Sequence, residues 1–538
     1  MYRPAGKAIS SMRSAISPSA FGPRPAKSFT PRRRATRSFF VMAMAVGFFR
    51  TSNESCGARI PGGEAADERR SHEVNEGGGC AMQDHADGTW VRVSENRWRR
   101  VNRREFLKLT AGAAGAAAAA GNLGSLLTTI VRAQQRELRI MTWSHFVPAF
   151  DAWFDPWAER WGQGKNIRVT VDHISFADII PRANAEVAAQ SGHDLFFFLS
   201  PPSAFEQQVL DLSDINREAE RRYGPMVPLV RKSSYNANTR KFFGFSDNWV
   251  PDPGDYLKSV WTAVGFPNGP ASWDDLLTGG RRIKERFRDI QIPIGIGLSQ
   301  DIDSNMATHA MLWAFGASEQ DADENITLNA EETIRAVEFG ATLFRDTMNP
   351  AVLSWNAASN NQALNARQTS YILNSISAYR TAQDNRLPVA DDINFVGALR
   401  GPRGRWASEH VMGVWVIWRF ARNPDNAKAF LLELVDNYRD AVIASKLYNF
   451  PSFMGSVAEK RVPVADKPTE GRKWVRAAVL KDPFGSNPVN KLAVLADAEE
   501  WSTNPGHPGP ANPAIGEIFD TFVIPDMFAK AATGQLTA

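Results

Sequence analysis

The arginine pair Arg103-Arg104 and the uncharged run Leu109–Val131 that follows it divide this 538-residue chain in two. Residues 1–100 show no steady hydrophobic period, and the stretch from Gly57 to Gly88 is polar and rich in Gly and Glu. Such a segment cannot bury enough apolar surface to offset its ordering entropy. We therefore expect residues 1–100 to be disordered or to precede the true translation start, and the folded protein to begin near residue 134.

The sequence around the arginine pair resembles a twin-arginine export signal. Phe106, Leu107 and Lys108 follow the pair, and Ala133 is a small residue where a signal peptidase can cut. On this resemblance, residues 101–133 are a signal peptide read by the twin-arginine translocase. A membrane anchor is the alternative, because the run is long enough to span a bilayer. Against it, Ala, Gly and Thr partition into lipid less well than Leu or Ile.

Charge and cysteine are distributed unevenly along the chain. Residues 1–135 carry 21 Lys and Arg against 10 Asp and Glu, which leaves 41 basic and 48 acidic residues in the remainder. A mildly acidic folded part argues against a nucleic-acid partner. Both cysteines, Cys56 and Cys80, precede the arginine pair, so the exported part has no thiolate for a metal, a cluster or a disulfide. We expect no cofactor and no metal.

Apolar periodicity predicts alternating strands and helices after residue 134. The predicted strands are Glu137–Thr142, Ile167–Val171 and Asp194–Leu199. Aromatic residues at helical spacing predict a helix between the first two strands, with a core stripe of Trp153, Trp157 and Trp161. Pro156 is expected to kink or restart this helix, and Gly162 and Gly164 to end it. Further helices are expected over residues 179–190 and 203–209. This alternation indicates an α/β fold with a parallel sheet covered on both faces.

Capping patterns predict helix starts further along the chain. Ser272, with Asp275 three residues later, predicts an N-cap. Asn329 predicts another, before a helix over residues 333–344, and Asn423-Pro424 predicts a third.

Several stretches together resemble the family 1 extracellular solute-binding proteins, the maltose-binding-protein-like receptors of ABC importers. The stretches that carry the resemblance are Ser191–Leu195, Val209–Leu212, Pro270–Leu276, Leu328–Glu332 and Ala427–Leu434. Their order and spacing extend from Glu137 to the C-terminus. The sequence departs from the family pattern at Ala366–Leu373, where a Gly-Lys-x-Ala-Met strand is usual.

The resemblance implies a two-lobe periplasmic-binding-protein fold of type II-like topology, with a ligand cleft between lobes joined by hinge strands. The implied boundaries are residues 134–250 and 401–448 for lobe 1, and 251–400 and 449–538 for lobe 2. It also implies a monomeric periplasmic receptor without catalytic residues, whose partners are a small-molecule solute and the transmembrane subunits of an ABC permease.

Ligands of open α/β sheets bind beyond the carboxyl ends of the strands. Of the 16 tryptophans, 14 follow residue 135, and an indole can stack on the C–H face of a sugar. We therefore expect a sugar, oligosaccharide or related polyol, held by strand-end residues and by residues near the implied crossovers. The expected cleft residues are Trp143, Ser144, His145, Phe176, Ser200, Ser203, Asn374, Ser377, Tyr379, Trp406, Tyr448 and Asn449.

Other functions stay open on the sequence alone. A receptor of the same fold could bind a polyamine, glycerol phosphate or a metal complex, and a twin-arginine-exported hydrolase or cofactor enzyme is a further class. The common nucleophile-elbow, zinc-protease and phosphate-loop motifs are not found in the sequence. Asp321, Asp323, Asn325 and Glu332 have the spacing of a calcium loop, but Ile326 stands where such a loop needs Gly.

Overall fold

A computed structural model describes residues 89–94, 97–101, 136–409 and 411–537. The chain divides into two units, residues 1–103 and 104–538. In the first unit, β1 (Thr89–Ser94) and β2 (Arg97–Val101) pair antiparallel, a hairpin that the sequence patterns do not predict. Residues 102–133 of the predicted export signal and both cysteines lie outside the described residues.

The second unit contains one large mixed sheet, which defines lobe 1. Its strand order is β14-β8-β13-β5-β3-β4. The predicted parallel arrangement is present on one side, where β3 pairs parallel with both β4 and β5. The other half is antiparallel, because β13 runs against β5 and β8. The strands span β3 (Arg136–Trp143), β4 (Ile167–Ile174), β5 (Leu195–Phe198), β8 (Phe245–Val250), β13 (Val411–Ile417) and β14 (Phe450–Pro451).

Helices cover this sheet. Helix α3 runs uninterrupted with Pro156 inside it and ends at Lys165, where Asn166 adopts φ 55°, so the predicted end at Gly162 and Gly164 is wrong. Of the predicted tryptophan stripe, Trp161 is buried, whereas the other two are only partly buried. The lobe 1 helices are α3 (Ala149–Lys165), α4 (Ile179–Ala189), α5 (Ser213–Tyr223), α6 (Pro228–Ser234), α14 (Pro424–Asp436) and α15 (Tyr438–Ala444), with 3-10 turns η1 (Phe176–Asp178) and η2 (Ser203–Gln208).

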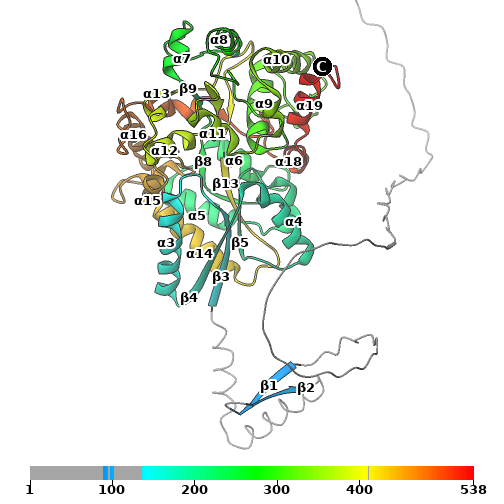
Figure 1. Ribbon diagram of the computed structural model, residues 1–538. Coiled ribbons are helices and arrows are strands. Elements are labelled where there is room, and N and C mark those ends of the chain that lie inside the picture. The colour runs from blue at the N-terminus through cyan, green and yellow to red at the C-terminus, as the bar shows by residue number, and fades with distance from the viewer. Residues whose placement is uncertain (1–88, 95–96, 102–135, 410, 538) are drawn as a thin grey trace, which may run out of the picture. The chain divides into compact units, whose positions relative to one another are not determined.

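Lobe 2 is built around the small antiparallel sheet β10-β9-β11, and Figure 1 shows most of its helices on the opposite side of the unit from β3 and β4. Its strands are β9 (Gly254–Leu257), β10 (Tyr371–Leu373) and β11 (Ile393–Val396). Its helices are α7 (Lys258–Ala263), α8 (Trp273–Arg286), α9 (Ile302–Phe315), α10 (Glu331–Thr347), α11 (Ser359–Asn365), α12 (Ser377–Asp384), α13 (Val389–Asp392), α18 (Pro513–Asp520) and α19 (Val523–Ala532), with the 3-10 turn η3 (Pro350–Ser354).

The helix starts test the capping predictions. The Asp275 amide donates to Ser272 Oγ over 3.1 Å, which confirms the N-cap of α8. The N-cap of α10 is Ala330 and not Asn329, so that prediction is one residue off. Asn423 holds the N-cap position of α14 with Pro424 next to it, but its side chain does not cap the helix.

The chain passes between the lobes three times. The first passage is Pro251-Asp252-Pro253, between β8 of lobe 1 and β9 of lobe 2. The return runs from β12 (Ala407–Ser408), which packs on α9, to β13, and so falls later in the chain than the expected boundary after residue 400.

The segment after β14 leads back toward lobe 2. Its elements are η4 (Met454–Val457), α16 (Lys467–Leu480), η5 (Ala493–Asp497), α17 (Ala498–Trp501) and β15 (Ser502–Thr503). β15 pairs parallel with β12 beside the return passage. A short hairpin, β6 (Tyr235–Asn236) with β7 (Lys241–Phe242), completes the described strands. No described helix has the length and apolar character needed to cross a bilayer.

Candidate functional site

A pocket of about 270 Å³ opens between the two lobes. Lobe 1 contributes η1, the start of α4 and the end of β5, with Phe176 and Ser200 among the lining residues. Lobe 2 contributes Gln300 and Asp301 before α9 and the Phe519–Phe522 turn between α18 and α19. The lobe 1 side of this pocket lies beyond the carboxyl ends of the parallel strands, where ligands of open α/β sheets bind.

The lobe 2 wall supplies carboxylates. Asp301 is the N-cap of α9 and accepts the Asp303 amide over 3.1 Å, which holds its side chain at the helix start. Burial raises the pKa of Asp520, on the same wall, to about 7. Paired with the apolar ring of Phe176, these oxygens form a lining that suits a ligand with hydroxyl groups and an apolar face.

An aromatic cluster connects this pocket with the interior of the cleft. The Trp143 ring, at the end of β3, meets Phe176 edge-on with centroids 5.5 Å apart. The Trp143 centroid also lies 4.8 Å from that of His145 and 6.5 Å from that of Tyr448. Four of the predicted site residues, from three separate parts of the sequence, are thus brought together.

His145 is held in one defined protonation state. Its Nδ1 accepts the Val147 amide over 2.9 Å, and its Nε2 lies 3.2 Å from Asn449 Oδ1. This pattern places the single proton on Nε2, where it donates to Asn449. Burial lowers the pKa of His145 to about 4, so the ring is neutral at pH 7. His145 therefore serves as a neutral hydrogen-bonding group that fixes Asn449.

Ser375 of lobe 2 contacts Tyr448 of this cluster, and Asn374 and Ser377 lie beside Ser375 in the chain. Asn374 and Ser377 are fully buried, and both hydrogen-bond to Asn361. Burial raises the pKa of Tyr448, and the charge of Asp303 raises it further. A hydrogen bond with the Ser375 side chain lowers the pKa of Tyr448 in part. Lobe 2 groups therefore lie within interaction range of the lobe 1 aromatic wall.

Four predicted site residues lie elsewhere. The Ser144 side chain is exposed. Ser203 donates to the Asn512 carbonyl over 2.7 Å and neither caps η2 nor lines the pocket. The Tyr379 hydroxyl donates to Ser486 over 2.8 Å inside lobe 2, and Trp406 packs against His507 with centroids 4.6 Å apart.

The sequence patterns missed a set of buried acidic residues in the cleft. They are Asp252, Asp255, Asp303 and Glu409, each no more than 8% exposed. A signal was available, because two acidic residues flank Pro253-Gly254 just after the predicted lobe boundary at residue 250. The pattern resembled an ordinary turn, in which acidic residues are common.

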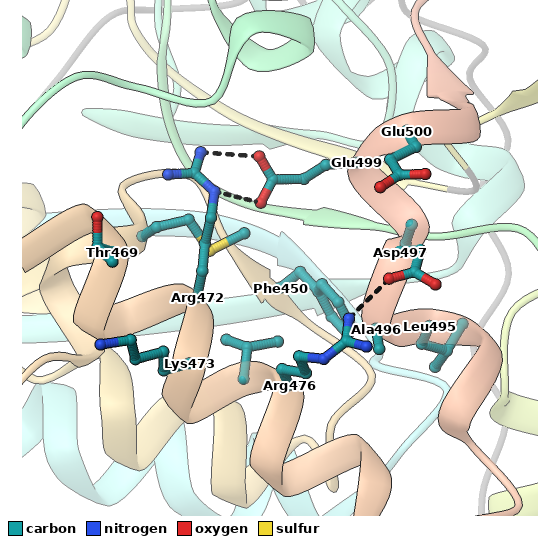
Figure 2. Close-up of a pocket in the computed structure, with 13 residues that line it drawn as sticks. Phe450, Thr469, Arg472, Lys473, Arg476, Leu495, Ala496, Asp497, Glu499 and Glu500 are labelled. Atoms are coloured by element: carbon teal, nitrogen blue, oxygen red, sulfur yellow. Dashed lines mark hydrogen bonds and ion pairs between the residues drawn. The ribbon is translucent and has the colours of Figure 1, made fainter. Parts of the chain in front are cut away.

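Another surface hollow, of about 440 Å³, lies beside α16 and η5 (Figure 2). Its basic residues already have acidic partners. Arg472 forms a bidentate pair with Glu499, with both distances 2.8 Å, and Arg476 pairs with Asp497 over 2.7 Å. Because these cations are neutralised by neighbouring side chains, the hollow does not form an anion site.

The sequence with calcium-loop spacing folds as a self-contained turn. Asp321 Oδ1 accepts the amides of Asp323 and Asn325, each over 2.9 Å. Among the residues that the structure describes, no group of three or more His, Cys, Asp or Glu side chains is arranged to hold a metal ion.

Comparison with known proteins places the chain in a family. Residues 147–436, more than half of the chain, match the profile of the bacterial extracellular solute-binding proteins. The chain belongs to this family, whose members bind solutes and are not enzymes. A search of curated protein sequences finds no significant match.

Solved structures share the fold at low sequence identity. Maltose-bound MalE3 of T. maritima is 16% identical with a TM-score of 0.59, over 74% of this chain and 95% of that one. A putative oligosaccharide periplasmic-binding protein from Synechococcus sp. MITs9220 is 17% identical with a TM-score of 0.61, over 74% and 94%. A mannitol-bound solute-binding protein of Agrobacterium vitis S4 is 15% identical with a TM-score of 0.54, over 75% and 94%. These likenesses confirm the predicted two-lobe periplasmic-binding-protein fold.

Proposed function

We propose that this protein is the solute-binding component of an ABC importer and that it takes up a sugar, oligosaccharide or polyol in the interlobe pocket. Family membership supports the receptor role. Structures of similar fold include complexes with maltose, ribitol and D-mannitol. The protein works in the periplasm as a monomer, performs no catalysis and hands its solute to the permease.

The observation that carries this proposal is the composition of the pocket from both lobes. Phe176 and Ser200 come from lobe 1, whereas Gln300 and Asp301 come from lobe 2. A solute that contacts all four bridges the lobes and stabilises the closed arrangement, because only that arrangement offers both sets of contacts. Lobe movement about the passages between the lobes then reports occupancy to the permease. The volume of about 270 Å³ is just below the usual range of roughly 300–1,000 Å³ for small-molecule sites and suits a small solute.

A thermal-shift screen tests the proposal. D-mannitol, ribitol, maltose and further sugars are added to the purified protein, and at least one is expected to raise the melting temperature in a saturable way. A ligand that binds only the folded state stabilises it by about 2.7 kcal/mol at 100 times its Kd. If no sugar or polyol raises the melting temperature at millimolar concentration, the proposal is wrong.

Export is expected to depend on the arginine pair. Replacing Arg103 and Arg104 with Lys should leave the precursor in the cytoplasm, because the planar guanidinium groups that a twin-arginine translocase reads are not reproduced by ammonium groups. Cell fractionation measures the distribution. The matched control is Arg132→Lys, a basic residue of the same segment outside the pair, which should be exported normally. If the precursor carrying both Arg103→Lys and Arg104→Lys is exported at the normal rate, another pathway is used.

A further inference from the structure

Three acidic side chains lie where the chain passes between the lobes. Asp252 belongs to the first passage, Asp255 lies on β9, and Glu409 follows β12. Their exposed fractions are 1%, 0% and 2%. Burial raises the pKa of Asp255 well above its ordinary value, and the neighbouring charge of Asp252 adds to the effect. Burial likewise raises the pKa of Glu409 well above its ordinary value, and the charge of Asp252 adds to the effect. Asp252 is therefore close enough to repel both Asp255 and Glu409.

In the described part of the chain, oxygen atoms of two of these carboxyl groups lack hydrogen-bond partners. Among the described residues, nothing donates to either oxygen of Asp255 or to Oε2 of Glu409. The hydroxyl of Tyr371, which is 0% exposed, is also unpartnered, and it lies within reach of the Asp252 and Asp255 charges. Asp247 on the adjoining strand β8 is also buried, but its carboxylate has partners. It accepts hydrogen bonds from Asn248 Nδ2 over 3.0 Å and from Trp415 Nε1 over 2.8 Å.

A buried carboxylate without a hydrogen-bond partner destabilises the folded protein. An isolated buried charge costs several kcal/mol, and a protonated carboxyl group still has a donor and acceptors to satisfy. Protonation alone therefore leaves polar atoms of Asp255 without partners. A cation with several donors would satisfy the oxygens and cancel the repulsion together. A protonated amine has three N–H donors and no acceptor, which matches a set of carboxylate and phenol oxygens.

The carboxyl groups are connected to the proposed solute pocket. The Tyr448 hydroxyl lies within range of both Asp303 and Asp252. The ring of Tyr448 neighbours Trp143, which in turn contacts Phe176 of the pocket wall. These contacts lead from the wall of the pocket to the carboxyl groups.

We propose that the solute carries a protonated amine, bound by Asp255 and Glu409, in addition to hydroxyl groups that bind in the pocket between Phe176 and Asp301. The solute class is an amino sugar or amino polyol. This inference rests on the proposed function, because it assumes that the solute binds between the lobes.

Matched pairs of probes test the amine directly. D-glucosamine is compared with D-glucose, and D-glucamine with D-sorbitol, by titration calorimetry and thermal shift at pH 7. Within each pair that binds, the amine is expected to bind at least tenfold more tightly. Asp255→Asn and Glu409→Gln should each reduce that preference to less than threefold.

Two controls separate recognition from folding. Unliganded Asp255→Asn should melt no lower than the parent protein, since no described residue donates a hydrogen bond to the Asp255 side chain that the change would remove. Asp247→Asn should melt lower, because it disturbs two hydrogen bonds, and should keep the amine preference.

The outcomes distinguish this inference from the proposed function. If the neutral member of each pair binds as tightly as the amine, or the preference survives in both Asp255→Asn and Glu409→Gln, the amine inference is overturned while the receptor function stands. If amines without hydroxyls, such as spermidine, bind and no hydroxylated probe does, the amine is supported and the sugar assignment falls. If none of these probes binds the folded protein, both proposals are contradicted.

Discussion

Replacing Asp482 with alanine is expected to destabilise the folded protein by about 3–5 kcal/mol, because it leaves a buried guanidinium group without its counter-ion. Arg380 on α12 donates from both terminal nitrogens to Asp482, over 2.8 and 3.1 Å. The side chains are 1% and 0% exposed. Arg380 also donates to the Lys446 carbonyl over 3.0 Å, so the pair braces the turn that leads to Tyr448 and Asn449 in the cleft.

Urea unfolding measures this loss, followed by tryptophan fluorescence and by circular dichroism so that coincident midpoints test two-state behaviour. The matched control is Asp497→Ala, which breaks the Arg476–Asp497 pair, in which both side chains are 54% exposed. An exposed pair contributes about 0–1 kcal/mol. If Asp482→Ala loses no more stability than Asp497→Ala, the buried pair does not brace lobe 2.

Replacing Trp143 with alanine is expected to weaken solute binding by about 1–3 kcal/mol, the scale of losing one large apolar contact. The same change should cost roughly 3–5 kcal/mol of folding stability, because Trp143 is only 3% exposed. From the sequence, Trp157→Ala is expected to lose more folding stability than Trp143→Ala. The structure reverses this order, because Trp157 is only partly buried. Trp143→Phe keeps a ring beside Phe176 and Tyr448, and so should fold nearly normally while binding less tightly.

Calorimetry with the solute found by screening measures binding, and urea unfolding measures stability. The control is Trp161→Phe, a buried position on α3 away from the cluster, which should change stability without changing affinity. Normal affinity in both Trp143 variants would show that Trp143 is a core residue with no influence on the site.

Local sequence signals predicted the parts of the fold that depend on local physics. The strand before Trp143 and the N-cap at Ser272 follow from period and capping chemistry, which act within a few residues. The antiparallel half of the large sheet could not be predicted in this way. It joins β8 and β13 from distant parts of the chain, and their pairing depends on topology rather than on either strand alone.

The same difference between local and long-range signals applies to the candidate site. Strand ends pointed to Trp143, His145, Phe176 and Ser200, since ligand position in such sheets follows from topology. The role of Asp255 could not be read from the sequence, because a carboxyl group without a partner exists only once the surrounding residues are packed. Tyr379 was assigned to the cleft by resemblance, and its hydroxyl faces Ser486 instead.

The central claim, that one solute bridges both lobes, is tested most directly by hydrogen–deuterium exchange on the free and the solute-saturated protein. The account predicts slower exchange in two places at once, around Phe176–Ile180 of lobe 1 and around Gln300–Asp303 of lobe 2, since these segments form opposite walls of the pocket. Protection confined to one lobe, or centred on the hollow beside Arg472 and Arg476, would contradict it.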